Sequence, residues 1–270
     1  MMYAEQTLTL NGKIEINYIH TPSLGRPIVL LHGAASEWQS FLPLIPVLAR
    51  QFQVYAIDLR GHGRSSWVTD GYQLSEYAKD IHCFLSDIIV EPTVLYGHSL
   101  GALIAILVAA QSPDRVHRLI LGDPPFYHHN TSTRESVWYE PFVKLYHVIS
   151  SYHSAQEIDD YTAAHYPNMG PERRKARAET LSHVDPNVVA AILDDRLVEG
   201  YDTGALLRQI TCPVLLIAGN PALGSALRPE DATYMLERLR SCDIVHMQEV
   251  GHGLPVGDAL SRVEDFLRTV

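Results

Sequence analysis

Residues 97–101 read Gly-His-Ser-Leu-Gly and place a potential nucleophile between two glycines. A short apolar run over 93–96 precedes them, and residues 102–110 are Ala, Leu, Ile and Val without Gly or Pro. This pattern predicts a strand, a sharp turn and a helix with Ser99 at the apex, where a strained backbone and close neighbours favour glycine. At a helix N-terminus, Ser99 could be a simple N-cap. The flanking elements favour a nucleophile in a site that stabilises negative charge.

A serine hydroxyl is a poor nucleophile at neutral pH and needs a neighbouring base. Residues 249–253 read Glu-Val-Gly-His-Gly and follow an apolar run at 245–247 that predicts the last strand. A histidine between two glycines in such a loop has little packing role, so we predict His252 as the base. His246 falls within the predicted strand and is interpreted as a partly buried neighbour.

The elements that must position these residues alternate between strand and helix patterns. Residues 7–10 and 14–18 alternate polar and apolar side chains around an Asn-Gly pair, which predicts a β-hairpin. Continuous apolar runs, typical of strands buried on both faces, occupy 27–31, 54–57, 94–96, 119–121 and 214–217. Helical patterns cover 42–50, 74–89 and 100–112. The predicted fold class is α/β, a mostly parallel doubly wound sheet with an N-terminal β-hairpin.

The segment 124–210 interrupts this alternation, because it has no apolar run typical of a buried strand. It predicts helices over 134–150, 155–164, 171–182 and 187–197, and we interpret it as a helical cap inserted into a core of residues 1–123 and 211–270. Its many aromatic residues can form the core of the cap itself, but some must face a cleft that the cap covers. The predicted pocket residues are Trp38, Phe126, Tyr127 and Trp138.

Composition excludes several classes of function. The 270 residues are 46% hydrophobic and 19% charged, as in an ordinary globular protein. A net charge of −10 argues against a nucleic-acid or anionic-membrane partner. Three cysteines without metal-ligand spacing predict neither a disulfide framework nor a metal site. The N-terminus lacks the basic start and apolar run of a signal peptide, and the longest apolar run is too short for a bilayer, so a cytoplasmic protein without membrane insertion is predicted.

Together, these motifs resemble the α/β-hydrolase superfamily, in the serine-nucleophile esterase or C–C hydrolase-like branch with a helical cap. The resemblance is carried, in family order, by residues 32–36 (His-Gly-Ala-Ala-Ser) with Trp38, residues 58–65 (Asp-Leu-Arg-Gly-His-Gly-Arg-Ser), residues 97–101 and Gly251-His252. It implies an oxyanion hole formed by the backbone N–H groups of Ala34 and Leu100, and no metal or organic cofactor. For residues 58–65 we expect a structural role, with Gly61 and Gly63 in the turn and with Asp58 and Arg60 holding the loop by hydrogen bonds.

The third member of the expected triad departs from the usual pattern of the superfamily. Most relatives place an aspartate after the seventh strand, where this chain has Ala222. Asp123 follows the sixth strand at the same edge of the sheet, and certain lipases and the haloalkane dehalogenases carry their acid there. We favour Asp123 as the acid, although relatives that keep the usual acid can also have a structural aspartate at this point. Glu230 and Asp231 are the reserve candidates, but after Pro229 they also suit the first turn of a helix.

The predicted activity is carboxylesterase-like cleavage of a small ester or related acyl compound with an apolar group, through an acyl-enzyme on Ser99. Serine at this position argues against the dehalogenase and epoxide-hydrolase branches, which use a carboxylate. Three alternatives stay open: a C–C bond hydrolase acting on a diketone, a hydroxynitrile-lyase-like enzyme and a ligand receptor on a hydrolase scaffold. The lyase would require a cation near the nucleophile, and Lys144 is the only lysine in the early cap.

Overall fold

A computed structural model describes residues 3–22 and 25–268 of the chain. Within them one eight-stranded sheet has the order β1-β2-β4-β3-β5-β6-β7-β8. The strands are β1 (Glu5–Leu10), β2 (Ile14–His20), β3 (Arg26–Leu31), β4 (Phe52–Ile57), β5 (Thr93–His98), β6 (Val116–Gly122), β7 (Val214–Ala218) and β8 (Cys242–His246). The β1–β2 and β2–β4 pairs are antiparallel and all the others are parallel. The predicted fold class and its N-terminal hairpin are confirmed.

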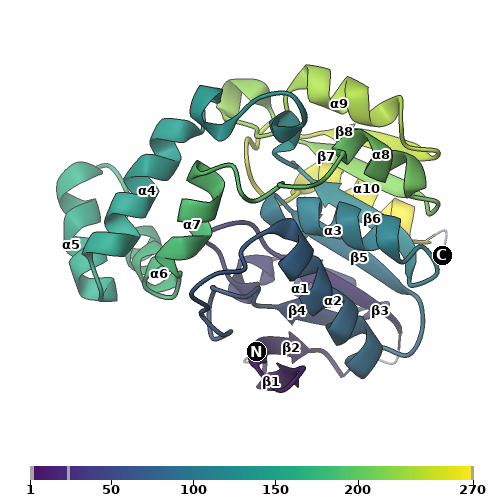
Figure 1. The fold of residues 1–270 in the computed structure, drawn as a ribbon, viewed down its shortest axis with the longest axis horizontal. Helices are drawn as coiled ribbons and strands as arrows, with labels where there is room; N and C mark the ends of the chain where they lie inside the picture. Colours follow the sequence, from purple (N-terminus) through teal and green to yellow (C-terminus); the bar gives the residue numbers. More distant parts are fainter. Residues whose placement is uncertain (1–2, 23–24, 269–270) are drawn as a thin grey trace.

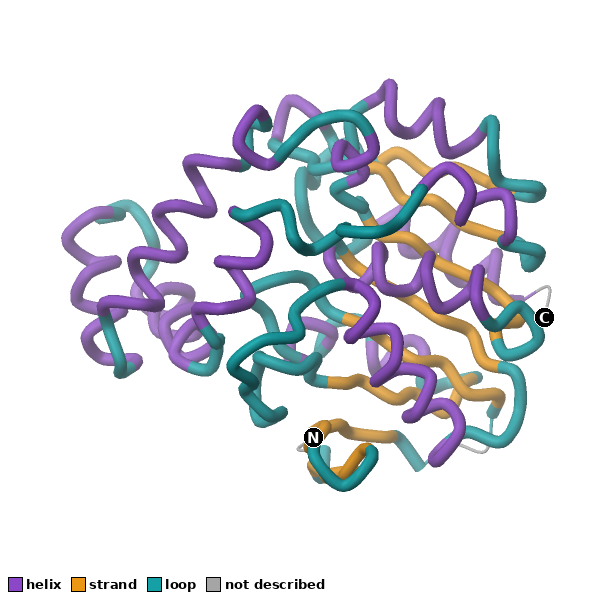
Figure 2. The backbone as a smooth tube through the Cα atoms, in the orientation of Figure 1, coloured by secondary structure: helices purple, strands orange, loops and turns teal. Residues whose placement is uncertain are grey.

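Helices cover both faces of the sheet, so the strands form a central layer (Figure 2). Successive residues of β3 alternate between two cores: Val29 and Leu31 join one, Ile28 and Leu30 the other. The first core also contains α2 (Leu74–Ile88), α3 (Leu100–Gln111), α8 (Thr203–Gln209) and α9 (Pro229–Leu236). The second contains α1 (Ile45–Leu48) and α10 (Gly257–Arg268). Burial on both faces explains why the central strands read as continuous apolar runs.

Four further helices form a group at one end of the molecule, at the left of Figure 1. They are α4 (Tyr139–Ser151), α5 (Ala155–His165), α6 (Pro171–Ser182) and α7 (Pro186–Leu193). The group has a small core of its own, which includes Val148, Ile158 and Leu181. We call these four helices the cap. The segment predicted as cap extends further, to residue 210, but its last helix α8 packs in the core with α3.

The cap is joined to the core by polar contacts, one buried and one partly buried. Tyr72 donates a 2.6 Å hydrogen bond to Asp185, the N-cap residue of α7. The Thr180 hydroxyl of α6 donates to the Glu37 carboxylate at 2.9 Å. Each contact links a loop of the core to one cap helix, so the cap has a defined position over the sheet edge.

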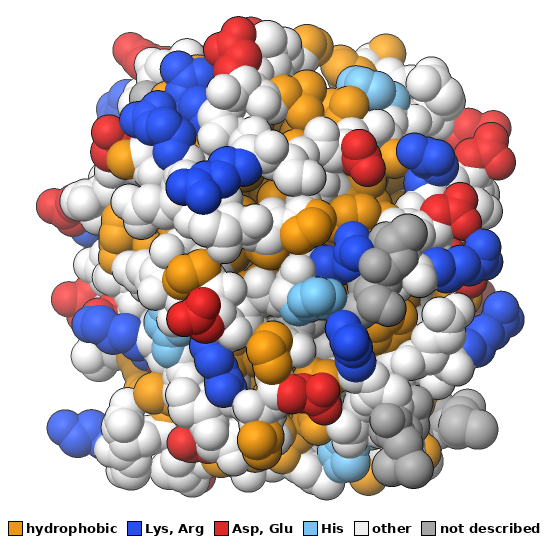
Figure 3. All heavy atoms as spheres, turned by 90° about the vertical axis from the view of Figure 1, so that its right-hand side faces the viewer, with side chains coloured by type: hydrophobic (Ala, Val, Ile, Leu, Met, Phe, Trp, Pro, Cys, Tyr) orange, Lys and Arg blue, Asp and Glu red, His pale blue; other side chains and the backbone are white. Residues whose placement is uncertain are grey.

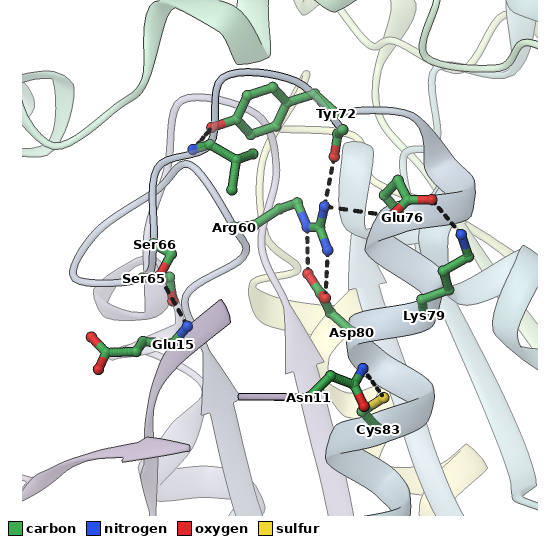
Figure 4. Close-up of polar contacts among 12 residues, drawn as sticks. Asn11, Glu15, Arg60, Ser65, Ser66, Tyr72, Glu76, Lys79, Asp80 and Cys83 are labelled. Carbon is green, nitrogen blue, oxygen red and sulfur yellow. Dashed lines mark hydrogen bonds and ion pairs between the residues drawn. The ribbon is translucent and has the colours of Figure 1, made fainter. Parts of the chain in front are cut away.

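The loop that contains Asp58 and Arg60 is fixed as the sequence predicts. Arg60 forms a bidentate pair with Asp80 of α2 at 2.5 and 2.6 Å and donates to the Gly71 carbonyl at 2.9 Å (Figure 4). The Asp58 carboxylate accepts hydrogen bonds from the backbone N–H groups of Trp38 and Arg64 at 2.8 and 3.1 Å. These hydrogen bonds therefore hold the loop with Asp58 and Arg60 in a defined position.

The structure differs from the predicted elements mainly where helices are short. The helix predicted over 42–50 is only the four-residue α1, after a 3-10 turn at Trp38–Phe41 (η1). Pro43 and Pro46 lie within 42–50 and restrict how far this helix extends. The helix predicted over 187–197 is α7, which ends at Leu193, shortly before Asp195 with its φ of 55°. The outermost residues of the predicted core, 1–2 and 269–270, lie outside the described residues.

On the face of the molecule opposite the cap, acidic and basic side chains are interspersed (Figure 3). Within the described part of the chain, every helix is too short or too polar to span a lipid bilayer.

Candidate active site

Ser99 occupies a strained turn between β5 and α3. Its φ and ψ are 54° and −118°, a backbone conformation that non-glycine residues rarely adopt. A Cβ on Gly97 would lie 2.1 Å from the Gly101 carbonyl oxygen, and one on Gly101 would lie 2.1 Å from the Leu31 carbonyl oxygen. Both glycines are therefore required by close backbone approach, as the sequence pattern suggested.

The side chains of Ser99, His252 and Asp123 form a continuous hydrogen-bonded chain. The His252 Nε2 atom lies 2.9 Å from Ser99 Oγ, and its Nδ1 atom lies 2.6 Å from Asp123 Oδ2. Because an ionised carboxylate only accepts hydrogen bonds, Nδ1 carries the proton and donates it to Asp123. Nε2 is then free to accept the Ser99 hydroxyl proton. The structure thus brings together three residues that are distant in sequence.

Asp123 is fully buried at the end of β6, and its φ is 44°. Besides the bond from His252, its carboxylate accepts hydrogen bonds from the loop after β7: Gly219 N (3.1 Å), Ser225 Oγ (2.5 Å), Ala226 N (2.8 Å) and Leu227 N (3.2 Å). Burial alone would raise the pKa of Asp123, but the bonds from His252, Ser225 and Ala226 outweigh it and hold the pKa below its usual value. Asp123 is therefore an anion beside His252.

The loop after β7 supplies no carboxylate to His252 among the described residues. Ala222, at the position where most relatives have their acid, is exposed and donates its N–H to Asn220. Glu230 and Asp231 begin α9, and both pair with Arg228. The geometry therefore favours Asp123 over both reserve candidates.

The two residues predicted to form the oxyanion hole both lie at the cavity that contains Ser99. Leu100 is the first residue of α3 and has no partner within the helix for its N–H. Ala34 lies in the loop after β3 and lines the same cavity as Ser99 and Leu100. The next residue, Ala35, has a φ of 53° and donates its N–H to His62 Nε2 at 3.3 Å, which fixes this loop. The oxyanion role of Ala34 and Leu100 stays a prediction.

The buried His32 and His62 and the partly buried His98 next to the site are neutral. Burial lowers the pKa of His32 to about 4, and burial together with His32 lowers that of His62 to about 3. Burial and the neighbouring His252 lower the pKa of His98 to about 3. The His98 ring lies 4.9 Å from the His252 ring, so a charge on it would oppose protonation of the base. The neutral His98 ring does not oppose protonation of His252.

A cavity of about 250 Å³ opens at Ser99 and His252, between the sheet edge and the cap. Tyr127 and Trp138 line it, as predicted, and the Trp138 ring lies 5.4 Å from the His252 ring. Further lining comes from Pro141, Phe142, Leu145, Ile192, Leu197, Ala34, Ala35 and Ala226. The volume is slightly below the usual range for ligand pockets, and the walls are mostly apolar, which suits a small molecule with an apolar group.

Trp38 and Phe126, also predicted as pocket residues, are not among the described residues that line this cavity. Trp38 is buried in the second core, and its indole N–H donates to Glu5 at 2.8 Å. Phe126 is buried in the first core, with its ring 6.1 Å from Tyr234. Both predictions were wrong because these large rings are taken up by the packing of the sheet faces.

Sequence reasoning missed several cavity residues. Phe142 and Leu145 of α4 follow the predicted Trp138, the N-cap residue of this helix, at helical spacing, a signal that could have identified this wall. Arg177 of α6 also lines the cavity, but in a helix with four basic residues nothing in the sequence distinguishes it. The role of Ser225 as a donor to Asp123 had no sequence signal either.

The fold and the site geometry agree with the comparison of the sequence against protein families. The model of the alpha/beta hydrolase fold matches residues 26–252, which are most of the chain. The chain belongs to this family. The resemblance inferred from the motifs is therefore confirmed for this α/β hydrolase.

The α/β hydrolase has relatives of similar length. An N-formylmaleamate deformylase from Pseudomonas putida is 28% identical over 255 residues, 93% of this chain and 90% of that protein. A 2-(acetamidomethylene)succinate hydrolase from Mesorhizobium japonicum is 28% identical over 215 residues, 77% of this chain and 75% of that protein. The crystal structure of an N-formylmaleamic acid deformylase from Pseudomonas putida has a TM-score of 0.75 at 25% identity, covering 92% of this chain and 94% of that one. Family and relatives together support a hydrolase.

Proposed function

We propose that this α/β hydrolase cleaves a small acyl compound through a covalent acyl-enzyme on Ser99. The observation that carries the proposal is the chain of hydrogen bonds from Ser99 Oγ through His252 to the buried Asp123 carboxylate, at 2.9 and 2.6 Å. A nucleophile, a base and a group that orients the base are the parts that serine-dependent acyl transfer needs. The cavity at Ser99 provides the space for the substrate.

The reaction follows from this geometry. His252 Nε2 accepts the Ser99 proton while Ser99 Oγ attacks the substrate carbonyl, and Asp123 stabilises the resulting imidazolium. The N–H groups of Leu100 and Ala34 would hold the oxyanion, each contributing about 3 kcal/mol to transition-state stabilisation. The imidazolium then protonates the leaving group. Water, deprotonated by His252, releases the acid and restores Ser99.

The bond that is cleaved can be an ester, as the sequence predicts, or an acyl–nitrogen bond. The second candidate is favoured by the relatives, since the names of two of them contain an N-formyl or an acetamido group. Both bonds use the same steps and differ only in the leaving group that His252 protonates. C–C cleavage of a diketone uses the same three residues and is the third candidate. Rates on matched esters, N-acyl compounds and aryl diketones would rank the three.

Covalent labelling of Ser99 tests the proposal. A fluorophosphonate probe should label the wild-type protein, and Ser99→Ala should abolish both labelling and turnover of p-nitrophenyl esters. Ser225→Ala is the matched control, because it removes a hydroxyl near Asp123 but leaves the nucleophile in place; it should still be labelled. An unlabelled wild-type protein that nevertheless binds small acyl compounds would overturn the proposal in favour of a receptor.

A further inference from the structure

Arg177 is placed differently from the other basic residues of α6. It lines both the cavity at Ser99 and a second cavity of about 350 Å³ within the cap. Arg174, one turn away, is paired with Asp159 at 2.5 Å. The Arg177 guanidinium has no hydrogen bond or ion pair to another described residue. Its positive charge is therefore available to pair with a ligand that occupies either cavity.

The walls of the two cavities carry no compensating negative charge. Pro141, Leu145 and Arg177 are shared by both, and no Asp or Glu is among the described residues that line either one. Lys144 of α4 lines the second cavity, so a second cation faces the same region. The whole chain has a net charge of −10, so this local excess of positive charge is a specific feature of the cap side of the site.

Filling the first cavity would remove water from this cation. Arg177 as a whole is an exposed residue, but surrounding protein atoms and the nearby Arg173 lower its pKa, so its guanidinium is already partly withdrawn from water. A substrate that is apolar throughout would displace water from the guanidinium without replacing its hydrogen bonds, which is costly. A substrate carboxylate would instead form a charge-assisted, bidentate pair with the planar guanidinium.

We infer that the substrate of this hydrolase carries a carboxylate, which Arg177 binds at the wall shared by the two cavities while the scissile carbonyl lies at Ser99. The inference builds on the proposed function and adds the substrate class: a small acyl compound with an anionic end and an apolar middle. Phe142 and Leu145 of α4 contact the middle. Arg177 is thus a specificity-determining residue contributed by the cap, remote from the reacting bond.

Paired substrates test the inference. p-Nitrophenyl half-esters of dicarboxylic acids from glutarate to suberate are compared with alkanoate esters of the same chain length, so that each pair differs by a carboxylate in place of a methyl group. Wild-type protein should prefer at least one half-ester. Arg177→Gln should lower kcat/KM for it by about 10- to 100-fold, mainly through KM, because one charge-assisted interaction is lost. The alkanoate should change by less than about twofold.

Two variants and one binding measurement complete the test. Arg177→Lys should retain part of the preference, and Lys175→Gln, an equal loss of charge on an exposed residue that lines neither cavity, should leave it unchanged. Calorimetric titration with the free dicarboxylates reads the anion site without turnover, and Arg177→Gln should weaken binding at least tenfold. Equal losses on both members of every pair, or no half-ester preferred, would overturn the inference. Fluorophosphonate labelling of Arg177→Gln shows separately whether the proposed function holds.

Discussion

The two sides of the cavity at Ser99 are built by different means. We call the side at the sheet edge, with Ser99, Asp123 and His252, the floor, and the side formed by the cap, with Trp138, Phe142 and Arg177, the roof. On the floor, Ser99 and Asp123 both have a positive φ, and Asp123 accepts four hydrogen bonds besides that of His252. On the roof, Phe142 of α4 and Trp138, which precedes this helix, line the cavity by packing, while Arg177 has no hydrogen-bond or ion-pair partner among the described residues. The floor is fixed mainly by backbone conformation and a network of hydrogen bonds, and the roof by the packing of side chains. We therefore expect changes in the floor to abolish the chemistry and changes in the roof to alter which substrates are used.

The largest effect should come from Asp123→Asn. An amide at this position presents an N–H to His252 or loses its own hydrogen bonds, so the imidazole takes the tautomer that cannot accept the Ser99 proton. Turnover should fall by about 10³- to 10⁴-fold while folding is retained. Steady-state rates on p-nitrophenyl esters, with circular dichroism as the check on folding, measure the effect.

The control for Asp123→Asn is Glu230→Gln, which alters an exposed reserve candidate paired with Arg228. It should change the rate by less than about twofold, since an exposed ion pair contributes little. Near-normal activity of Asp123→Asn would remove Asp123 from the triad.

Substitutions at two glycines compare the floor with the cap by their effects on the free energy of unfolding. In Gly101→Ala the new Cβ would lie 2.1 Å from the Leu31 backbone oxygen, so β3 and α3 must move apart. We expect a loss of at least about 3 kcal/mol of unfolding free energy or failure to fold. In Gly170→Ala, at the start of α6 in the cap, nothing lies within 4 Å of the new Cβ, and stability should change by less than about 1 kcal/mol. Urea unfolding of both variants measures these two changes. Equal losses of unfolding free energy would contradict the expected difference between the floor and the cap.

The sequence predicted the floor well because its constraints are local. Gly97, Gly101 and the apolar runs around them follow from close backbone approach and burial on both faces, and these leave a pattern that can be read along the chain. Asp123 was predicted from its place after β6 and from Ala222 in the usual position. The loop that donates to its carboxylate could not be foreseen, since residues 219–227 become its neighbours only when the sheet has formed.

The roof was predicted less well because it depends on packing between helices. The helical cap was expected, yet its aromatic residues do not show in sequence which ring faces the cavity and which enters a core. Trp38 and Phe126 fill cores, whereas Trp138 faces the cavity. Only the relative positions of the helices decide between these outcomes.

The pH dependence of stability should report the histidines near Ser99 whose pKa values are lowered by desolvation. The pKa of His98 falls to about 3 in the folded chain, against the model-peptide value of about 6.5, so between these values the unfolded chain binds more protons. Stability is therefore complete above about pH 6.5 and is lost as the pH falls, by about 2 kcal/mol for this histidine at about pH 5. His32 and His62 add losses in the same direction.

Urea unfolding at about pH 7.5 and pH 5 measures this loss. His98→Leu should reduce the difference between the two pH values by about 2 kcal/mol, because leucine cannot be protonated. His153→Gln, which alters an exposed cap residue, should leave the difference unchanged. An unchanged difference in His98→Leu would show that the pKa of His98 is not lowered in the folded chain.

The smallest expected effect comes from two tryptophans that were predicted to have the same role. Trp138→Ala removes a wall of the cavity beside His252 and should raise KM for an apolar ester by about tenfold, with little loss of stability, because the side chain is only partly buried. Trp38→Phe removes the hydrogen bond to Glu5 from a buried core residue and should cost about 1 kcal/mol of unfolding free energy with KM unchanged. Each variant is measured for both KM and urea unfolding. If both variants lowered the free energy of unfolding and left KM unchanged, Trp138 would be a packing residue of the cap and would not help to select the substrate.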